Sequence, residues 1–397
     1  MSLKELASRL EIEEYPEEFE KIYKELNGNN KAFFNKEEFD KLEAEYGILE
    51  QYYDSVVGLA QKLAEDKDLS LWVSMVAEFV KTMPKERFND AKLPKSQSPG
   101  AEMMHIYPLL ALAPTTVELY KNHGFSKEEI HGIFNVFRIS LRLTEQATGK
   151  PGYSAGYYGW TRIYSHCEIF DYTSFNFQFK KLVYHGMLLQ NKKNSDKFAV
   201  ILTEGDFNAK GLMTDAEGTD GEIAFSADFS ETDEAYIAHE AIGGFVLPEL
   251  KTFKKSEWEC IVKEGDDILS LHIPRNVDFS AEAIDDSLDN GIRIAKERFP
   301  EYDPKIVFCC SWLLDPQLSE LQGEKSKIYG FANRFMRFPA APLKVRAGFG
   351  FVFLGYSEDD LEALPEDTSL RRKLKDFYLK GGKMAFVPGF MADRIIK

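Results

Sequence analysis

The chain has 397 residues, 44% of them hydrophobic, a length that predicts two or three domains. It has 49 basic and 65 acidic residues, and the formal net charge of −16 argues against binding to nucleic acid or to an anionic membrane, because both need a basic surface. No stretch approaches the roughly 20 apolar residues of a membrane span. The N-terminus has no apolar signal segment and the four cysteines have no paired spacing, so we expect a cytoplasmic protein without disulfides.

The first 150 residues are predicted to form helices. Ser126 and Glu129 have the spacing of a capping box, which starts a long helix with one apolar stripe. The stripe consists of Ile130, Ile133, Phe134, Phe137 and Leu141. Residues 149–160 interrupt this pattern with Gly and Pro, so we expect a helical domain over 1–160 and a second domain over 161–397.

Strands are predicted to begin the second domain. Phenylalanines alternate with polar residues within 170–184, and 198–203 is a second apolar run. Residues 258–262 and 268–273 alternate on either side of a Glu-Gly-Asp-Asp turn, which predicts a hairpin. The segment 234–241 has a helical pattern, and the apolar run 348–355 predicts a buried strand.

A strand, a helix and a strand are predicted after this turn. Ser280 is placed as an N-cap, and the helix after it has an apolar face. The apolar run 306–314 is typical of a strand buried on both faces, so the unit should be a parallel crossover. Short helices are expected at 328–335 and at 369–380.

Four motifs in this half resemble those of a known family. They are GD-x-x-L-x-x-HIP, SWLLDPQL, K-I-x-x-F-x-x-RF and T-S-L-R-R followed by a Gly-Gly pair. Together they resemble bacterial acyltransferase-like proteins with a helical N-terminal domain and a C-terminal domain of the GNAT (N-acetyltransferase) type, over about 170–389. The resemblance implies an α+β fold, in which a helical domain precedes a GNAT-like mixed sheet flanked by helices. It also implies transfer of an acyl group from acyl-CoA, such as acetyl-CoA, to a small-molecule amine by direct attack.

The resemblance also implies a cofactor site. Acyl-CoA should lie where the two central strands splay, with its pyrophosphate at the start of the helix between them. The residues expected to hold it are Arg275, Asn276, Ser280, Ser311 and Asn333. The family usually has Q/R-x-x-G-x-G/A in this loop, whereas PRNVDFSAE has no glycine. An ordinary capped helix is therefore the alternative at this position.

Two residues are candidates for proton transfer. His272 lies near the end of its predicted strand and would relay the proton that an attacking amine loses. Tyr329, on one helix face with Asn333, resembles the GNAT tyrosine that protonates the departing thiolate. The alternatives are a buried, hydrogen-bonded histidine and a tyrosine that only packs.

The acceptor site is predicted from aromatic residues. Tyr158 and Trp160, between the domains, would form a wall of the acceptor pocket, and Trp312 and Asp315 would lie at its mouth. The alternatives are a core role for Trp312 and a helix cap for Asp315. No metal is expected, since His239 and Glu240 lack the second histidine of a zinc motif.

Two other functions remain open. A ligand-binding module that keeps the GNAT-like fold without catalysis is supported by the missing glycines. A protein whose helical half is an interaction surface would show a large exposed apolar patch there. A cleft between the strands that end at Ile273 and Trp312 would favour acyl-CoA binding if open, and the module if filled by side chains.

Overall fold

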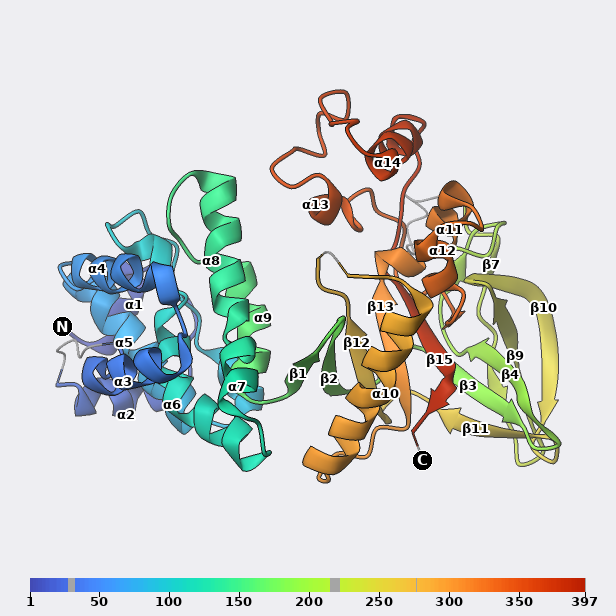
Figure 1. The fold of residues 1–397 in the computed structure, drawn as a ribbon, viewed down its shortest axis with the longest axis horizontal. Coiled ribbons are helices and arrows are strands. Elements are labelled where there is room, and N and C mark those ends of the chain that lie inside the picture. The colour runs from blue at the N-terminus through green and yellow to red at the C-terminus, as the bar shows by residue number, and fades with distance from the viewer. Residues whose placement is uncertain (28–32, 215–221, 276, 397) are drawn as a thin grey trace. The chain divides into compact units, whose positions relative to one another are not determined.

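The computed structural model describes residues 1–27, 33–214, 222–275 and 277–396. The chain divides into two compact units, Met1–Phe170 and Asp171–Lys397. Helices form the first unit, and the large sheets belong to the second (Figure 1). This confirms the predicted fold class of a helical domain followed by mixed sheets with flanking helices. The expected boundary after residue 160 falls inside a helix, α9 (Ala155–Ser165), and the division between the units comes after that helix.

The first unit is built around two apolar helices, α5 and α6, which pack against each other and bury most of their residues. Its helices are α1 (Leu3–Arg9), α2 (Glu18–Glu25), α3 (Lys36–Tyr46), α4 (Tyr53–Leu63), α5 (Lys67–Thr82), α6 (Tyr107–Asn122), α7 (Lys127–Ile133), α8 (Asn135–Thr148) and α9, with short 3-10 turns η1 (Glu50–Tyr52), η2 (Lys85–Asp90) and η3 (Ala101–Met103). The predicted capping box is present, because Ser126 Oγ accepts the N–H of Glu129 at 3.2 Å and the Glu129 carboxylate accepts the N–H of Ser126 at 2.7 Å.

The predicted long helix after this box is wrong. It divides at Phe134 into α7 and α8. Arg138 donates a hydrogen bond from Nη2 to the carbonyl of His131 at 3.0 Å, so a carbonyl in the last turn of α7 is satisfied by a side chain. The apolar stripe is nevertheless buried in both pieces.

Sheet A of the second unit holds the predicted crossover. Its order is β1 (Ile169–Tyr172), β2 (Phe175–Lys181), β12 (Asp267–His272), β13 (Ile306–Ser311), β15 (Val387–Ile395) and β14 (Met336–Arg337). Strands β12 and β13 are parallel and are joined by α10 (Ala281–Arg298), as predicted. Helix α10 packs closely on the sheet, since a Cβ placed on Gly291 would lie 2.2 Å from Cζ of Phe177.

Sheet B belongs to the same unit and lies beside sheet A in the view of Figure 1. It has the order β10 (Phe245–Lys254), β9 (Ala235–Ile242), β4 (Asn194–Leu202), β3 (Gly186–Asn191) and β11 (Trp258–Val262), and β8 (Ser230–Glu231) pairs with β9. A small third sheet contains β5 (Asp206–Phe207), β6 (Met213–Thr214) and β7 (Phe225–Ser226). One apolar cluster joins Ile268 and Phe308 of sheet A with Leu188 and Val200 of sheet B, so the two sheets pack on a common core.

The predicted hairpin at 258–273 is wrong, because its two strands belong to different sheets. Strand β11 pairs with β3, whereas β12 pairs with β2 and β13. Val262 and Ile268 both enter the core between the sheets. The intervening turn therefore crosses from one layer to the other, and Asp266 holds it by accepting the N–H of Lys263 at 2.9 Å.

Two further predictions are wrong. Residues 234–241 do not form a helix but most of β9, an inner strand between β10 and β4 whose pairing on both edges overrides the local helical pattern. Residues 348–355 do not form a strand. Gly348, at φ +79°, starts a single helical turn, α13 (Phe349–Val352), which ends where Phe353 N–H bonds to the Phe349 carbonyl at 2.7 Å.

A second apolar cluster lies after the carboxyl end of β13. It contains Trp312, Phe349, Phe353, Leu374 and Tyr378, with Ile273 and Phe279 packed against it. The helices near it are α11 (Pro316–Gln322), α12 (Lys327–Ala332) and α14 (Ser369–Leu379), and the short helices predicted at 328–335 and 369–380 are confirmed. Within the described ranges, no helix combines the length and apolar character needed to cross a membrane.

Candidate functional site

The two parallel central strands separate at their carboxyl ends. Their ladder ends at the pair Leu271 and Cys309. Beyond it, His272 stays paired with β2, whereas Cys310 stays paired with β15. Each strand follows its outer neighbour, so the inner edges no longer satisfy each other. We call this opening the fork; its sides are residues 272–274 and 310–312. Open α/β sheets bind ligands at such carboxyl ends.

His272 is a neutral imidazole at one side of the fork. Its Nε2 lies 2.9 Å from Oε1 of Gln178, and because an amide oxygen only accepts, Nε2 carries the proton. Burial, followed by the positive charge of Lys180, lowers the pKa of His272 to about 3. A base this weak does not keep a proton near neutral pH. It can, however, pass one on through its two ring nitrogens.

Lys180 was missed by the sequence analysis. Residues directly opposite in an antiparallel pair share a face, and Lys180 is opposite the fully buried Ile268, as Gln178 is opposite Ser270. Burial lowers the pKa of Lys180, and no other described residue forms a hydrogen bond or ion pair with its ammonium. The polar positions of β2 look like a solvent face in the sequence. These positions face sheet B and not solvent. The sequence could have shown this only through the pairing of sheet B, which it does not reveal.

The start of α10 leaves backbone donors uncapped. Ser280 occupies the N-cap position, but its hydroxyl donates to Asp278 Oδ2 at 2.9 Å and does not cap the helix, which corrects the predicted cap. Asp278 also accepts the N–H of Ser280 at 2.9 Å and lies 3.2 Å from Lys327 Nζ. These hydrogen bonds to Ser280, followed by Lys327, lower the pKa of Asp278. Arg275 is exposed without a partner among the described residues, and Asn276 lies outside them.

Tyr329 is half-buried on α12, next to a buried arginine. Asn333, one turn later, donates its N–H to the Tyr329 carbonyl at 3.0 Å and accepts a bond from Arg337 Nη2 at 3.0 Å. Arg337 also donates to Ser319 Oγ at 2.9 Å. Burial lowers the pKa of Arg337, while the nearby Asp315 and Tyr329 raise it. Arg337 therefore holds α12, and with it Tyr329, on the sheet.

The residues after β13 are tightly packed. Ser311 Oγ accepts the N–H of Leu313 at 3.2 Å, and the ring of Trp312 lies against Gly348, where a Cβ would be 2.3 Å from the indole. Asp315 is fully buried, accepting the N–H groups of Gln317 and Ala385, each at 2.8 Å. Burial raises the pKa of Asp315 to about 6. Trp312 thus packs in the core and Asp315 caps the following helix. A role of either residue in substrate binding stays a prediction.

The other two predicted acceptor residues are on α9. The ring of Tyr158 lies 5.0 Å from that of Phe88, and Trp160 meets the edge of Tyr164 at 5.7 Å. Both side chains are partly exposed. Their role at an acceptor pocket stays a prediction.

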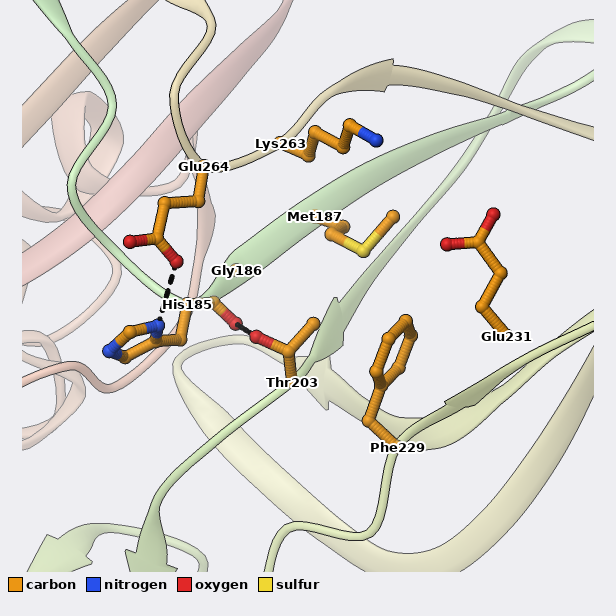
Figure 2. Close-up of a pocket in the computed structure, with 8 residues that line it drawn as sticks. All are labelled: His185, Gly186, Met187, Thr203, Phe229, Glu231, Lys263 and Glu264. Atoms are coloured by element: carbon orange, nitrogen blue, oxygen red, sulfur yellow. Dashed lines mark hydrogen bonds and ion pairs between the residues drawn. The ribbon is translucent and has the colours of Figure 1, made fainter.

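A surface cavity of about 320 Å³ lies elsewhere on the second unit. Figure 2 shows His185 and Glu264 turned toward each other at its edge, with Nδ1 3.0 Å from Oε2, and Met187 and Phe229 farther along. Glu264 precedes β12, so this cavity is near the amino end of the strand whose carboxyl end forms the fork. None of the predicted site residues lines it. In the part of the chain that is described, no three metal-ligating side chains gather in a way that could hold a metal ion.

A mixed sheet whose central parallel strands separate beside the start of their connecting helix defines a domain of the GNAT type. Comparison with known families agrees, because the model of the GNAT-like C-terminal domain matches residues 177–391 and that of the N-acyltransferase N-terminal domain matches residues 37–167. The chain belongs to this acyltransferase-like family, which confirms the resemblance of the motifs. No curated protein matches the chain by sequence.

Solved acyltransferases share the fold over the whole chain. An acyltransferase mutant in complex with octanoyl-CoA is 17% identical, with a TM-score of 0.62 and 100% of both chains covered. An acyltransferase in complex with CoA and 10C-teicoplanin is 16% identical, with a TM-score of 0.59 and the same coverage. An acyltransferase with decanoyl-CoA is 15% identical, with a TM-score of 0.60 over 99% of both chains.

Proposed function

We propose that this protein is an acyl-CoA-dependent N-acyltransferase that moves an acyl group to a small-molecule amine by direct attack. The observation that carries the proposal is the fork between β12 and β13, which opens beside the uncapped start of α10. The family supports the same chemistry. We further propose a cytoplasmic location, which the free state of all four cysteines supports.

The cofactor's diphosphate would lie at the start of α10. Uncapped N–H groups and the positive end of the helix dipole favour an anion there. Arg275 has no partner among the described side chains, and Lys327 is within 3.2 Å of the Asp278 carboxylate at the same place. Asp278 forms an ion pair with Lys327, and its carboxylate would repel the phosphates. Binding therefore requires the Lys327 side chain to leave Asp278 and contact the phosphates.

The acyl chain would lie on the apolar side of the fork. Ile273, at one strand end, packs against the cluster that contains Trp312, at the other. Side chains fill this space, which by the criterion given above favours the non-catalytic module. A long acyl chain must displace some of them, whereas an acetyl group needs little room. Solved acyltransferases of this fold hold octanoyl-CoA and decanoyl-CoA. From the ligands of these relatives, and not from the room at the fork, we propose a medium-chain acyl-CoA as the co-substrate ahead of acetyl-CoA.

The reaction needs one proton removed and one supplied. The amine nitrogen attacks the thioester carbonyl carbon, a C–N bond forms, and the C–S bond breaks to release CoA thiolate. His272, whose pKa is lowered to about 3, would pass the amine proton along and not store it. Burial lowers the pKa of Lys180 and so favours its neutral amine, and in that neutral form Lys180, on the same sheet face, would receive the proton. Tyr329 would protonate the thiolate.

Calorimetry with acetyl-, octanoyl- and decanoyl-CoA tests the cofactor site. Binding to the wild type should weaken about tenfold in Arg275→Ala, because one charge-assisted contact to phosphate is lost. Arg9→Ala removes an exposed arginine of the first unit and serves as the control. Release of free CoA thiol in the presence of amines tests the transfer. Binding without release under any amine would favour the non-catalytic module, and no binding of any acyl-CoA would refute the proposal.

A further inference from the structure

One face of α9 holds buried polar atoms that the described residues leave unsatisfied. Tyr158 and Arg162 are four residues apart and so lie on the same face of the helix. The Tyr158 hydroxyl and the Arg162 Nε are both buried, and neither has a hydrogen-bond partner among the described residues. Buried polar groups are nearly always paired with protein, water or a ligand, so two unpaired donors one turn apart offer a place for a partner from outside the chain.

Aromatic rings pack around these two donors. The Phe88 ring is 5.0 Å from that of Tyr158 and lies under the Arg162 guanidinium at 5.7 Å. The His105 ring meets the Tyr158 ring edge-on at 5.9 Å. Burial lowers the pKa of His105 to about 4, so its imidazole is neutral at physiological pH. These residues thus present a cation, a hydroxyl and a neutral imidazole against flat apolar surfaces.

The missing partner should be acidic. The chain has more carboxylates than cations, and other arginines are paired, such as Arg87 with Glu18 and Arg371 with Asp367. Arg162 forms no ion pair with any carboxylate that the structure describes. A guanidinium presents a flat fork of donors that matches a carboxylate. Burial raises the pKa of the Tyr158 phenol, so it keeps its proton and can add a third hydrogen bond.

We propose that the α9 cluster, Tyr158 and Arg162 over Phe88 with His105, binds the carboxylate of a small planar organic acid. The guanidinium and the phenol hold the carboxylate, and the rings of Phe88 and His105 contact the planar body. This site lies within the first unit and does not depend on the proposed transferase activity.

The full-length chain, labelled at the arginine side chains, allows a direct test by NMR. Benzoate is the probe, and the Nε–H signal of Arg162, assigned through Arg162→Lys, reports on the site. The signal should shift and become protected from exchange as benzoate is added. Arg162→Gln should weaken benzoate binding by about tenfold, and Tyr158→Phe by roughly threefold, since each removes a hydrogen bond to the anion.

The control is Arg142→Gln, which removes an exposed arginine of α8 and should leave benzoate binding unchanged. An Arg162 signal that benzoate does not move would overturn the proposal, as would equal binding by wild type and Arg162→Gln. A stronger response to inorganic phosphate than to benzoate would also overturn it, because the aromatic rings would then have no role. The wild-type titration alone decides the matter if a variant fails to fold.

Discussion

Replacing Asp278 by asparagine should strengthen acyl-CoA binding. Its carboxylate lies at the start of α10, where the diphosphate is proposed to bind, and it holds Lys327 at 3.2 Å. Asparagine keeps an oxygen that can accept the Ser280 N–H and removes only the charge. The substitution therefore tests electrostatics at this position with little change of shape.

The magnitude follows from Coulomb's law. Two phosphate charges near the carboxylate are repelled by it even in a water-like dielectric, so removing its charge should strengthen binding by up to about tenfold. Salt screens exposed charges, so the gain should fall as ionic strength rises. Lys327→Ala should act in the opposite direction, because it removes the cation that would turn to the phosphates.

Calorimetry with octanoyl-CoA at low and at physiological ionic strength measures the effect. Asp303→Asn, beyond the other end of α10, removes the same charge away from the proposed phosphate site and serves as the control. An equal gain in both variants would mean that only net charge matters. Unchanged or weaker binding in Asp278→Asn would refute a phosphate site at the start of α10.

Three further predictions follow from the second unit and its surroundings. Gly291→Ala should lower the free energy of unfolding by about 1–3 kcal/mol in urea, because the new methyl meets the ring of Phe177, whereas Gly132→Ala, with open space around it, should not. The pKa of Asp315 is raised to about 6 from an ordinary 3.8, so the folded state binds the carboxyl proton more tightly than the unfolded state does. The contribution of Asp315 to the free energy of unfolding should therefore fall by roughly 3 kcal/mol as the pH rises from about 4 to 7. Urea unfolding should show a flatter pH dependence in Asp315→Asn than in the wild type, and the same pH dependence in both would contradict the raised pKa. Tyr329→Phe should lower kcat about a hundredfold with little change in KM, as loss of a general acid does, and an unchanged kcat would exclude that role.

The sequence predicted the elements that local signals define. The crossover from β12 through α10 to β13 was predicted correctly, since a buried strand pattern, an apolar helix face and a second buried run lie within one short segment. The hairpin at 258–273 failed for a different reason. Alternation identifies a strand but not its partner, and both strands needed to bury Val262 and Ile268 in a core between two sheets.

The candidate site was predicted only in part, for the same reason. His272 and Tyr329 were proposed as site residues from the sequence, but Lys180 was not, because the alternation of β2 looks the same whether its polar side faces water or a second sheet. The hydroxyl of Ser280 was predicted to accept a backbone N–H of the helix, whereas it donates to Asp278, two residues earlier, which also accepts the Ser280 N–H. Asp278 competes with the helix for the Ser280 hydroxyl, and this competition removes the N-cap hydrogen bond although the sequence still has the pattern of an N-cap.

The absence of glycine from the loop before α10 does not by itself decide between a transferase and a binding module. Glycines let a backbone approach a diphosphate closely, but a helix start can supply unpaired N–H groups without them, and α10 has no side-chain cap. What opposes an anion here is the carboxylate of Asp278, and what favours one is Arg275 with Lys327. At the proposed phosphate site, the balance of these three charges should therefore set the affinity for acyl-CoA. A chain that binds acyl-CoA only after Asp278→Asn would be a module that has lost its cofactor through one charge, whereas binding by the wild type requires that the two cations outweigh it.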